Sequence, residues 1–179
     1  MADVMLDIET LGFRPECVVL TIGAIKFDPY NPGMEPHSGF YQRLDVDEQF
    51  ALGRTADDST LEWWTQQEES VREEALGEEG RVSLMEFARS LNKYMVGVDN
   101  IWAQGPTFDF VILENLFRML DVPVNWQFWQ IRDSRTLFKV LGEPRSAVRA
   151  EAHNALADCY YQAIGVQQVL KELKDFRNE

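Results

Sequence analysis

The chain has 179 residues and a formal net charge of −13, and 45 % of its residues are hydrophobic, including eleven phenylalanines and five tryptophans. This length and apolar content are typical of one folded domain, here residues 1–179, and argue against a disordered chain. No apolar run is long enough to span a membrane, and no basic segment leads into a long apolar stretch near the first residue. We therefore expect a soluble, cytoplasmic protein.

The acidic charge is unevenly distributed along the chain. Residues 45–86 contain thirteen acidic residues against three arginines, a balance of −10, whereas residues 132–149 contain five basic residues against two acidic ones, a balance of +3. Acidic surface repels phosphate, which disfavours long non-specific contacts with nucleic acid. The basic segment has the sign that phosphate binding requires, although a run of charge is also typical of a solvated face.

Apolar and β-branched segments predict three strands in the first part of the chain, around 5–8, 18–27 and 39–44. Capping-box patterns predict helices from about Ser59 and from about Ser83, because a hydroxyl and a glutamate three residues later satisfy the first free amides of a helix. The later part predicts strands at 100–104 and 128–131, and helices at 108–120, 136–141 and 155–174. Strands first and strand–helix alternation later indicate an α/β fold, a mixed β-sheet flanked by helices.

Two carboxylates stand at the end of the first predicted strand. Side chains alternate between the two faces of a strand, so Asp7 and Glu9 project from the same face. Like charges held together need a compensating cation, and hard divalent metals prefer carboxylate oxygens. The alternative is a solvated face near the end of an edge strand, which is the commoner explanation of an isolated Asp-x-Glu.

Three further residues have the chemistry of a metal or acid–base site. Asp109 follows the predicted strand 100–104 at the start of a helix, an edge where ligands of α/β sheets gather. His153 and Asp158 stand just before and within the first turn of the last predicted helix. Each residue alone has an ordinary explanation, because acids in a first helical turn complement the helix dipole and a single histidine is often structural.

Together these motifs resemble the DEDDh (DnaQ-like) 3'-5' exonuclease family. Asp7-Ile8-Glu9-Thr10-Leu11-Gly12 resembles the family's Asp-x-Glu-Thr-x-Gly, Phe108-Asp109 its Phe-Asp, and the segment from His153 to Asp158 its His-x-Ala-x-x-Asp. The segments 63–67 and 132–137 further resemble the small DexA-like phage exonucleases and related bacterial exoribonucleases. Gln104-Gly105-Pro106 departs from the pattern, because many members have an asparagine shortly before Phe-Asp, and Cys159 replaces a small alanine.

The resemblance implies a ribonuclease H-like domain that hydrolyses single-stranded nucleic acid from a free 3' end to nucleoside 5'-monophosphates. It implies two divalent ions, Mg²⁺ or Mn²⁺, with Asp7 bridging them, Glu9 and Asp158 completing one and Asp109 holding the other. His153 would be the general base, because its neutral form is abundant at cellular pH. RNA is preferred slightly over DNA, and a homodimer is expected because several relatives form one.

The resemblance and the local chemistry also suggest substrate contacts. Thr10 is the candidate for the 3'-hydroxyl and Leu11 for a wedge against the last base, and one of Trp63 and Trp64 is expected to stack on a base while the other packs in the core. The substrate-binding candidates are Thr10, Leu11, Phe108, Trp64, Arg145 and Arg149. The alternative functions are a catalytically silent nucleic-acid-binding or partner-recruiting module on the same fold, and a metal-dependent nucleotide phosphatase.

Overall fold

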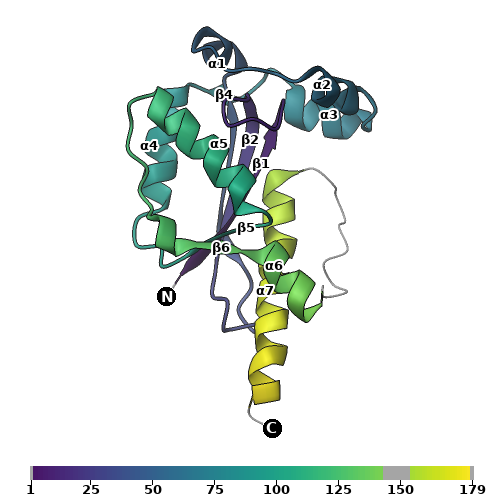
Figure 1. Cartoon of the computed structure of the whole chain (residues 1–179), viewed down its shortest axis with the longest axis vertical. Helices are drawn as coiled ribbons and strands as arrows, with labels where there is room; N and C mark the ends of the chain where they lie inside the picture. Colours follow the sequence, from purple (N-terminus) through teal and green to yellow (C-terminus); the bar gives the residue numbers. More distant parts are fainter. Residues whose placement is uncertain (1, 143–153, 178–179) are drawn as a thin grey trace.

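The computed structural model describes residues 2–142 and 154–177, and Figure 1 shows the arrangement of its elements. Six strands form one sheet in the order β4-β3-β2-β1-β5-β6. The strands are β1 (Asp3–Thr10), β2 (Val19–Phe27), β3 (His37–Leu44), β4 (Arg81–Val82), β5 (Ile101–Ala103) and β6 (Ile131–Asp133). The first three pair antiparallel, while β4, β5 and β6 each join by parallel pairing, so the sheet is mixed as expected.

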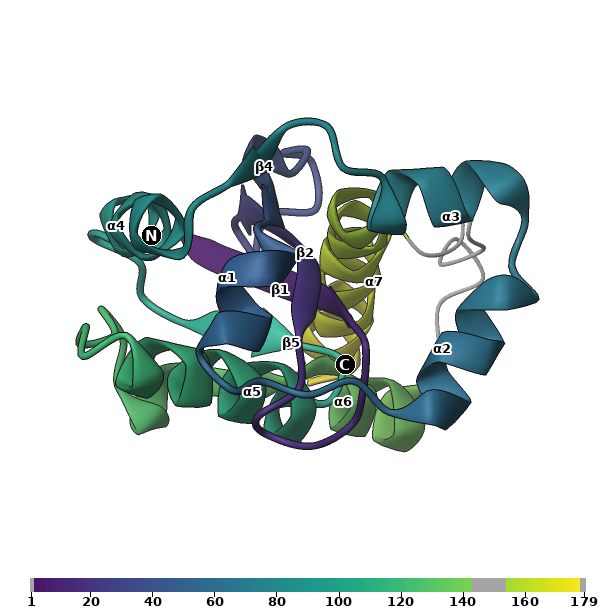
Figure 2. The same cartoon turned by 90° about the horizontal axis from the view of Figure 1, so that it is seen from above.

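Helices cover both faces of this sheet. They are α1 (Val46–Ala51), α2 (Asp58–Thr65), α3 (Glu69–Leu76), α4 (Leu84–Tyr94), α5 (Pro106–Met119), α6 (Ser134–Leu141) and α7 (Ala155–Arg177), with one 3-10 turn, η1 (Phe128–Gln130). Seen from above, α4 lies on one side of β1 and α7 on the other (Figure 2). The predicted α/β class with a mixed, helix-flanked sheet is confirmed.

The alternation of side chains along β1 decides which residues meet which helices. Val4, Leu6 and Ile8 pack in a core with α4 and α5. Met5 packs on the opposite face with residues of α6 and α7. Because Asp7 follows Met5 by two residues, its side chain belongs to the face that α7 covers. The carboxylates of β1 therefore point toward the last helix.

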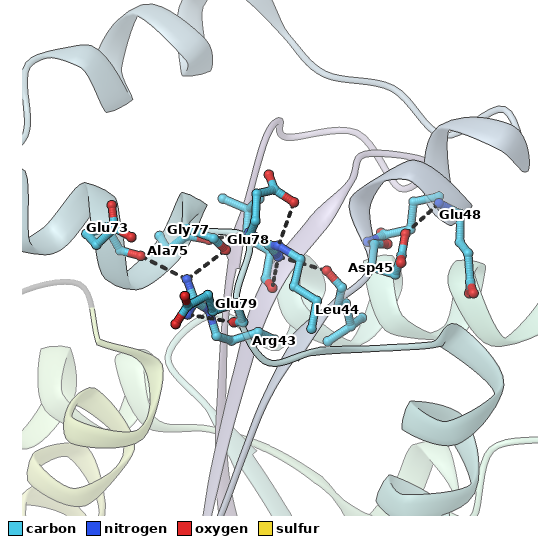
Figure 3. A network of polar contacts seen from close by, with 12 residues as sticks. Arg43, Leu44, Asp45, Glu48, Glu73, Ala75, Gly77, Glu78 and Glu79 are labelled. Atoms are coloured by element: carbon cyan, nitrogen blue, oxygen red, sulfur yellow. Dashed lines mark hydrogen bonds and ion pairs between the residues drawn. The ribbon is translucent and has the colours of Figure 1, made fainter.

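A third cluster of apolar residues closes the far end of the sheet, where α1, α2 and α3 lie beyond the last residues of β1 (Figure 1). Arg43 ties α3 and the turn after it to β3: its Nη2 atom donates to the carbonyls of Glu73 and Gly77, both at 2.8 Å, and its Nη1 atom donates to the carbonyl of Glu79 at 2.9 Å (Figure 3). Arg81 donates in turn to the carbonyls of Leu44 and Ala75. These bonds fix α3 relative to the sheet.

Several local predictions differ from the structure. Ser83 caps α4, with its hydroxyl accepting from the amide of Glu86, but α2 begins at Asp58 and Ser59 lies inside its first turn. The segment 128–131, predicted as a strand, is mostly the 3-10 turn η1, and β6 starts only at Ile131. Pattern alone cannot separate a short apolar run in a strand from one in a turn. The structure also adds α1, α3 and β4, which were not predicted.

In the part of the chain that the structure describes, no helix combines the length and apolar character needed to cross a membrane.

Candidate active site

Asp7 and Glu9 are held by the central strand pair of the sheet. In the antiparallel register between β1 and β2, Asp7 lies opposite Gly23 and Glu9 lies opposite Thr21. The register shifts between Glu9 and Thr10, which marks an irregularity at the end of the pairing. Both carboxylates are half-buried, so they stand where the rigid sheet ends and solvent begins.

Gly23 lets the first turn of α7 approach the sheet. A Cβ atom at this position would lie 2.3 Å from the carbonyl carbon of Ala155 and 2.4 Å from the amide nitrogen of Leu156, distances that no real side chain tolerates. The thiol of Cys159, one turn further along, donates to the carbonyl of Gly23 at 3.3 Å. Because Gly23 has no side chain, the first turn of α7, which contains Asp158, can pack close to the sheet and to β1.

Polar bonds hold the start of α7 from the other side. The side-chain oxygen of Asn154 accepts from the amide of Ala157 at 3.0 Å, which is the geometry of an N-cap. The side-chain amide of Asn154 donates to Glu74 at 3.3 Å, and the hydroxyl of Tyr41 donates to the same carboxylate oxygen at 2.5 Å. Strand β3 and helix α3 therefore anchor the helix end that carries Asp158.

These supports bring three carboxylates together. Asp7, Glu9 and Asp158 each offer one oxygen atom, and the three oxygens lie within 4.8 Å of one another. Two of the residues are close in sequence, but Asp158 comes from nearly 150 positions away along the chain. The predicted convergence of these three acids is therefore seen in the structure.

Asp109 lies beside the cluster without joining it at that separation. It sits in the first turn of α5, which follows Gly105, a glycine with a φ of 120°. Its carboxyl is 4 % exposed, and burial raises its pKa to about 7, although hydrogen bonds from its own amide and from the amide of Ile8 and the charge of Arg135 oppose this rise. The hydrogen bond from the amide of Ile8 joins Asp109 to the backbone of β1.

The electrostatics of Asp7 show how closely the acids interact. Burial by the surrounding protein raises the pKa of Asp7 well above its usual range, and the charges of Asp109, Glu9 and Asp158 raise it further. A hydrogen bond from the Gln162 side chain is the opposing effect. A divalent cation at this cluster would offset the repulsion and favour the ionised form of Asp7.

The donor set fits a hard divalent cation. All of the converging ligand atoms are carboxylate oxygens, which Mg²⁺ and Mn²⁺ prefer, and the described part of the site contributes no thiolate to them. Cys159 is buried nearby, but burial and then the charges of Asp7, Asp109 and Asp158 raise its pKa well above its usual value, so it stays a neutral thiol.

Basic residues line the rim near Asp109. Nε and Nη2 of Arg135 donate to the carbonyl of Gln104 at 3.3 and 2.7 Å. Gln104, Arg135, Phe138 and Lys139 line a cavity of about 200 Å³. Arg135 lies in the basic segment 132–149 and in the family-like segment 132–137, but nothing in the sequence alone marks it as a site residue. Its place near Asp109 becomes apparent only in the fold, where α6 lies beside the end of β5.

The structure corrects one predicted substrate contact. The Trp64 side chain is 2 % exposed and packs in the third core cluster, and its indole N–H donates to the carbonyl of Thr10 at 3.0 Å. It cannot present a ring face to a base from that position. The neighbouring Trp63 is 38 % exposed, with its ring centre 4.9 Å from that of Trp64 in an edge-to-face arrangement. Trp63 is therefore the candidate for stacking.

The other predicted contacts lie next to the acids. The Thr10 hydroxyl donates to the carbonyl of Gly12 at 2.7 Å, which leaves its oxygen able to accept a further bond. Leu11 is buried in the third cluster and Phe108 is half-buried against the main core. Their roles with substrate stay predictions. His153, Arg145 and Arg149 lie outside the described residues.

The sequence was compared with known families and proteins. A family model for the 3'-5' exoribonuclease Rv2179c-like domain matches residues 2–170. An exodeoxyribonuclease of Enterobacteria phage T4 is 26 % identical over 205 aligned positions, which cover 96 % of this chain and 90 % of the phage protein.

Solved structures share the fold. Exonuclease I of E. coli in complex with a dA16 oligonucleotide superposes with a TM-score of 0.64 at 18 % identity, over 98 % of this chain but only 42 % of the exonuclease I chain. The nuclease domain of 3'hExo, described as a DEDDh family member bound to rAMP, superposes with a TM-score of 0.62 at 11 % identity over 96 % of this chain and 92 % of that domain. The predicted ribonuclease H-like fold and 3'-5' exonuclease class are confirmed, and the chain belongs to the Rv2179c-like 3'-5' exoribonuclease domain family.

Proposed function

We propose that this protein is a divalent-metal-dependent exonuclease that removes nucleotides one at a time from the 3' end of single-stranded RNA, with DNA as a second substrate. The observation that carries the proposal is the convergence of Asp7, Glu9 and Asp158 within 4.8 Å, with Asp109 beside them. A module that only binds nucleic acid gains nothing from buried acids that repel both one another and phosphate.

The four acids have distinct roles in this proposal. Asp7, Glu9 and Asp158 would hold one cation, and Asp7 and Asp109 would hold a second, with water completing the shells. Bound cations supply an activated water and relieve the charge that develops on the leaving oxygen. Mg²⁺ and Mn²⁺ are the proposed cations. His153 is proposed to take the proton of the attacking water, a role that rests on the sequence resemblance.

The 3' end would enter beside the residues that follow Glu9. The Thr10 hydroxyl oxygen, already donating to Gly12, can accept a bond from the terminal 3'-hydroxyl. Trp63 offers an exposed ring for a base, and Arg135 with Lys139 lines a basic cavity on the Asp109 side. Base stacking and a few basic side chains suit a short single strand, because the acidic remainder of the surface repels a long duplex.

RNA is proposed ahead of DNA because the family model is that of an exoribonuclease. The phage relative is named an exodeoxyribonuclease, so both sugars must be tested. Labelled at the 5' end, single-stranded RNA and DNA of one sequence should shorten stepwise from the 3' end with Mn²⁺ or Mg²⁺ and stay intact in EDTA. A 3'-phosphate should block the reaction, whereas a blocked 5' end should not.

Matched variants distinguish the loss of an acid in the proposed site from the loss of an acid elsewhere on the surface. Glu9→Gln should abolish the ladder, whereas Glu62→Gln, which removes an exposed acid on α2, should leave it unchanged. Cleavage of circular strands would contradict an exonuclease, and release of phosphate from mononucleotides with no effect on oligomers would favour a phosphatase. Binding of oligomers without cleavage would favour the silent module. The proposed homodimer is tested by light scattering after size exclusion.

A further inference from the structure

Gln162 stands one helical turn after Asp158 on α7. Residues four positions apart lie on the same face of a helix, so both side chains reach toward β1. Gln162 is 8 % exposed, and a hydrogen bond from its side chain opposes the rise in the pKa of Asp7. No sequence motif marks this residue, and it is not one of the proposed metal ligands or substrate contacts.

The two ends of this amide have different surroundings. A carboxylate that binds a cation is ionised and can only accept hydrogen bonds, so in the cation-bound site the NH₂ group faces Asp7 and the carbonyl points elsewhere. That carbonyl oxygen, Oε1, is buried and has no hydrogen-bond partner among the residues that the structure describes. Buried acceptors in folded proteins are nearly always satisfied, and this one belongs to a residue beside acids that would bind a cation, so a donor that arrives with the cation would satisfy it.

The described neighbours of the site do not supply that donor. Asp7, Glu9 and Asp158 are acceptors when ionised, and the Cys159 thiol already donates to the carbonyl of Gly23. A water molecule bound to a cation is a strong donor, and Mg²⁺ in particular retains several waters when carboxylates bind it. Side chains that hold both a ligand and a bound water are known to orient metal sites.

We propose that Gln162 is a positioning residue for the metal site, whose NH₂ group orients the Asp7 carboxylate and whose carbonyl oxygen accepts a hydrogen bond from a water of the cation's shell. The inference rests on the proposed function, because it requires the cation. It adds a residue outside the acidic motif that sets metal affinity and the orientation of a shared ligand.

A second glutamine on the same helix provides a matched control. Gln167 is also buried, but its side-chain amide donates to three backbone carbonyls, those of Asp28 at 2.9 Å, Asn31 at 3.2 Å and Met34 at 2.9 Å. It holds the turn between β2 and β3, away from the acids. Replacing each glutamine with methionine keeps the volume and removes the amide.

The two variants should give opposite results. In Gln162→Met, the dissociation constant for Mn²⁺, measured by calorimetric titration, should rise by roughly 10- to 100-fold, while the melting temperature of the metal-free protein should not fall. In Gln167→Met, the melting temperature of the metal-free protein should fall and the Mn²⁺ affinity should be unchanged. Gln162→Leu repeats the first measurement with a second apolar side chain of similar size.

An unchanged Mn²⁺ affinity in both Gln162 variants would overturn the inference, as would a loss of stability in the metal-free variant with no change in affinity, because that pattern describes a merely structural glutamine. The parent protein distinguishes this from failure of the proposed function. If the parent binds Mn²⁺ and degrades oligonucleotides while the variants bind Mn²⁺ equally well, only the role of Gln162 is refuted. If the parent does neither, both proposals fail.

Discussion

Replacing Gly23 with alanine tests whether the approach of α7 to the sheet builds the site. The new Cβ atom would lie 2.3 Å from the backbone of Ala155, and ordinary contact begins at 3.4 Å, so the first turn of α7 must retreat by about 1 Å. Backbone cannot rotate away as a flexible side chain can. Because Asp158 lies in that turn, its carboxylate would move away from Asp7 and Glu9.

The retreat should reduce activity far more than it reduces stability. A displacement of about 1 Å at a catalytic centre lowers the rate by roughly 10²-fold. Overpacking costs about 1–3 kcal/mol, which for a domain of this size lowers the melting temperature by roughly 2–12 °C. Turnover of a labelled oligonucleotide and Mn²⁺ affinity should be measured well below the melting temperature of the variant, so that the folded protein is compared with the folded parent.

Gly33→Ala is the matched control. Gly33 lies in the loop between β2 and β3, and the nearest atom to a Cβ there is the side-chain oxygen of Asn31 at 3.6 Å, an ordinary contact. This variant should keep the activity, metal affinity and melting temperature of the parent. If Gly23→Ala kept the turnover and the metal affinity of the parent, the packing of α7 on β2 would not set the position of Asp158, and the reasoning would be refuted.

Three further predictions concern the acids and the aromatic pair. Asp7→Asn should raise the melting temperature of the metal-free protein and remove most of the stabilisation by Mn²⁺, about 2.7 kcal/mol in the parent at a hundredfold excess over the dissociation constant, with equal ionic strength of monovalent salt as control. Burial raises the pKa of Asp3, whose carboxyl accepts a hydrogen bond from the indole of Trp102 at 2.7 Å. Ionisation of Asp3 therefore destabilises the fold. The contribution of Asp3 to the free energy of unfolding falls as the pH rises from the ordinary pKa of 3.8 through the raised pKa. The stability of the parent relative to Asp3→Asn should therefore decline with pH over that interval, and a constant difference would contradict the pKa shift. Trp64→Ala should cost about 3–5 kcal/mol of unfolding free energy. Trp63→Ala should cost less stability, because its ring is partly exposed, and should weaken binding of single strands by about 1–3 kcal/mol, to be measured by thermal melts and by titration with inactive protein.

The sequence was sufficient to place the acids of β1 because strand alternation is a local rule. It assigns Asp7 and Glu9 to one face without knowledge of any partner, and the structure puts α7 on that face. The start of α7 at Ala155 was also predicted, and the structure shows that Asn154 caps this helix. Local patterns therefore predicted the positions of Asp7, Glu9 and Asp158 within their strand and helix.

The supports of the site could not be read locally. Gly23 within an apolar strand suggests that some backbone approaches closely, but only the fold shows that the approaching segment is the first turn of α7. Trp63 and Trp64 are adjacent on one short helix, and which of them is buried depends on the cluster beneath α2. Gln162 resembles any polar residue on a helix until Asp7 is seen next to it.

The contacts that hold the start of α7 in place oppose the repulsion between the carboxylates of the site. Acids brought together without a cation destabilise the fold: burial raises the pKa of Asp7, and the charges of Asp109, Glu9 and Asp158 raise it further. A helix free to move would relax by carrying Asp158 away from β1. The contact with Gly23 on one side and the bond from Asn154 to Glu74 on the other hold it in place, and Arg43 in turn holds α3 to the sheet. These contacts thus hold the acids close together against their mutual repulsion, which a bound cation would relieve.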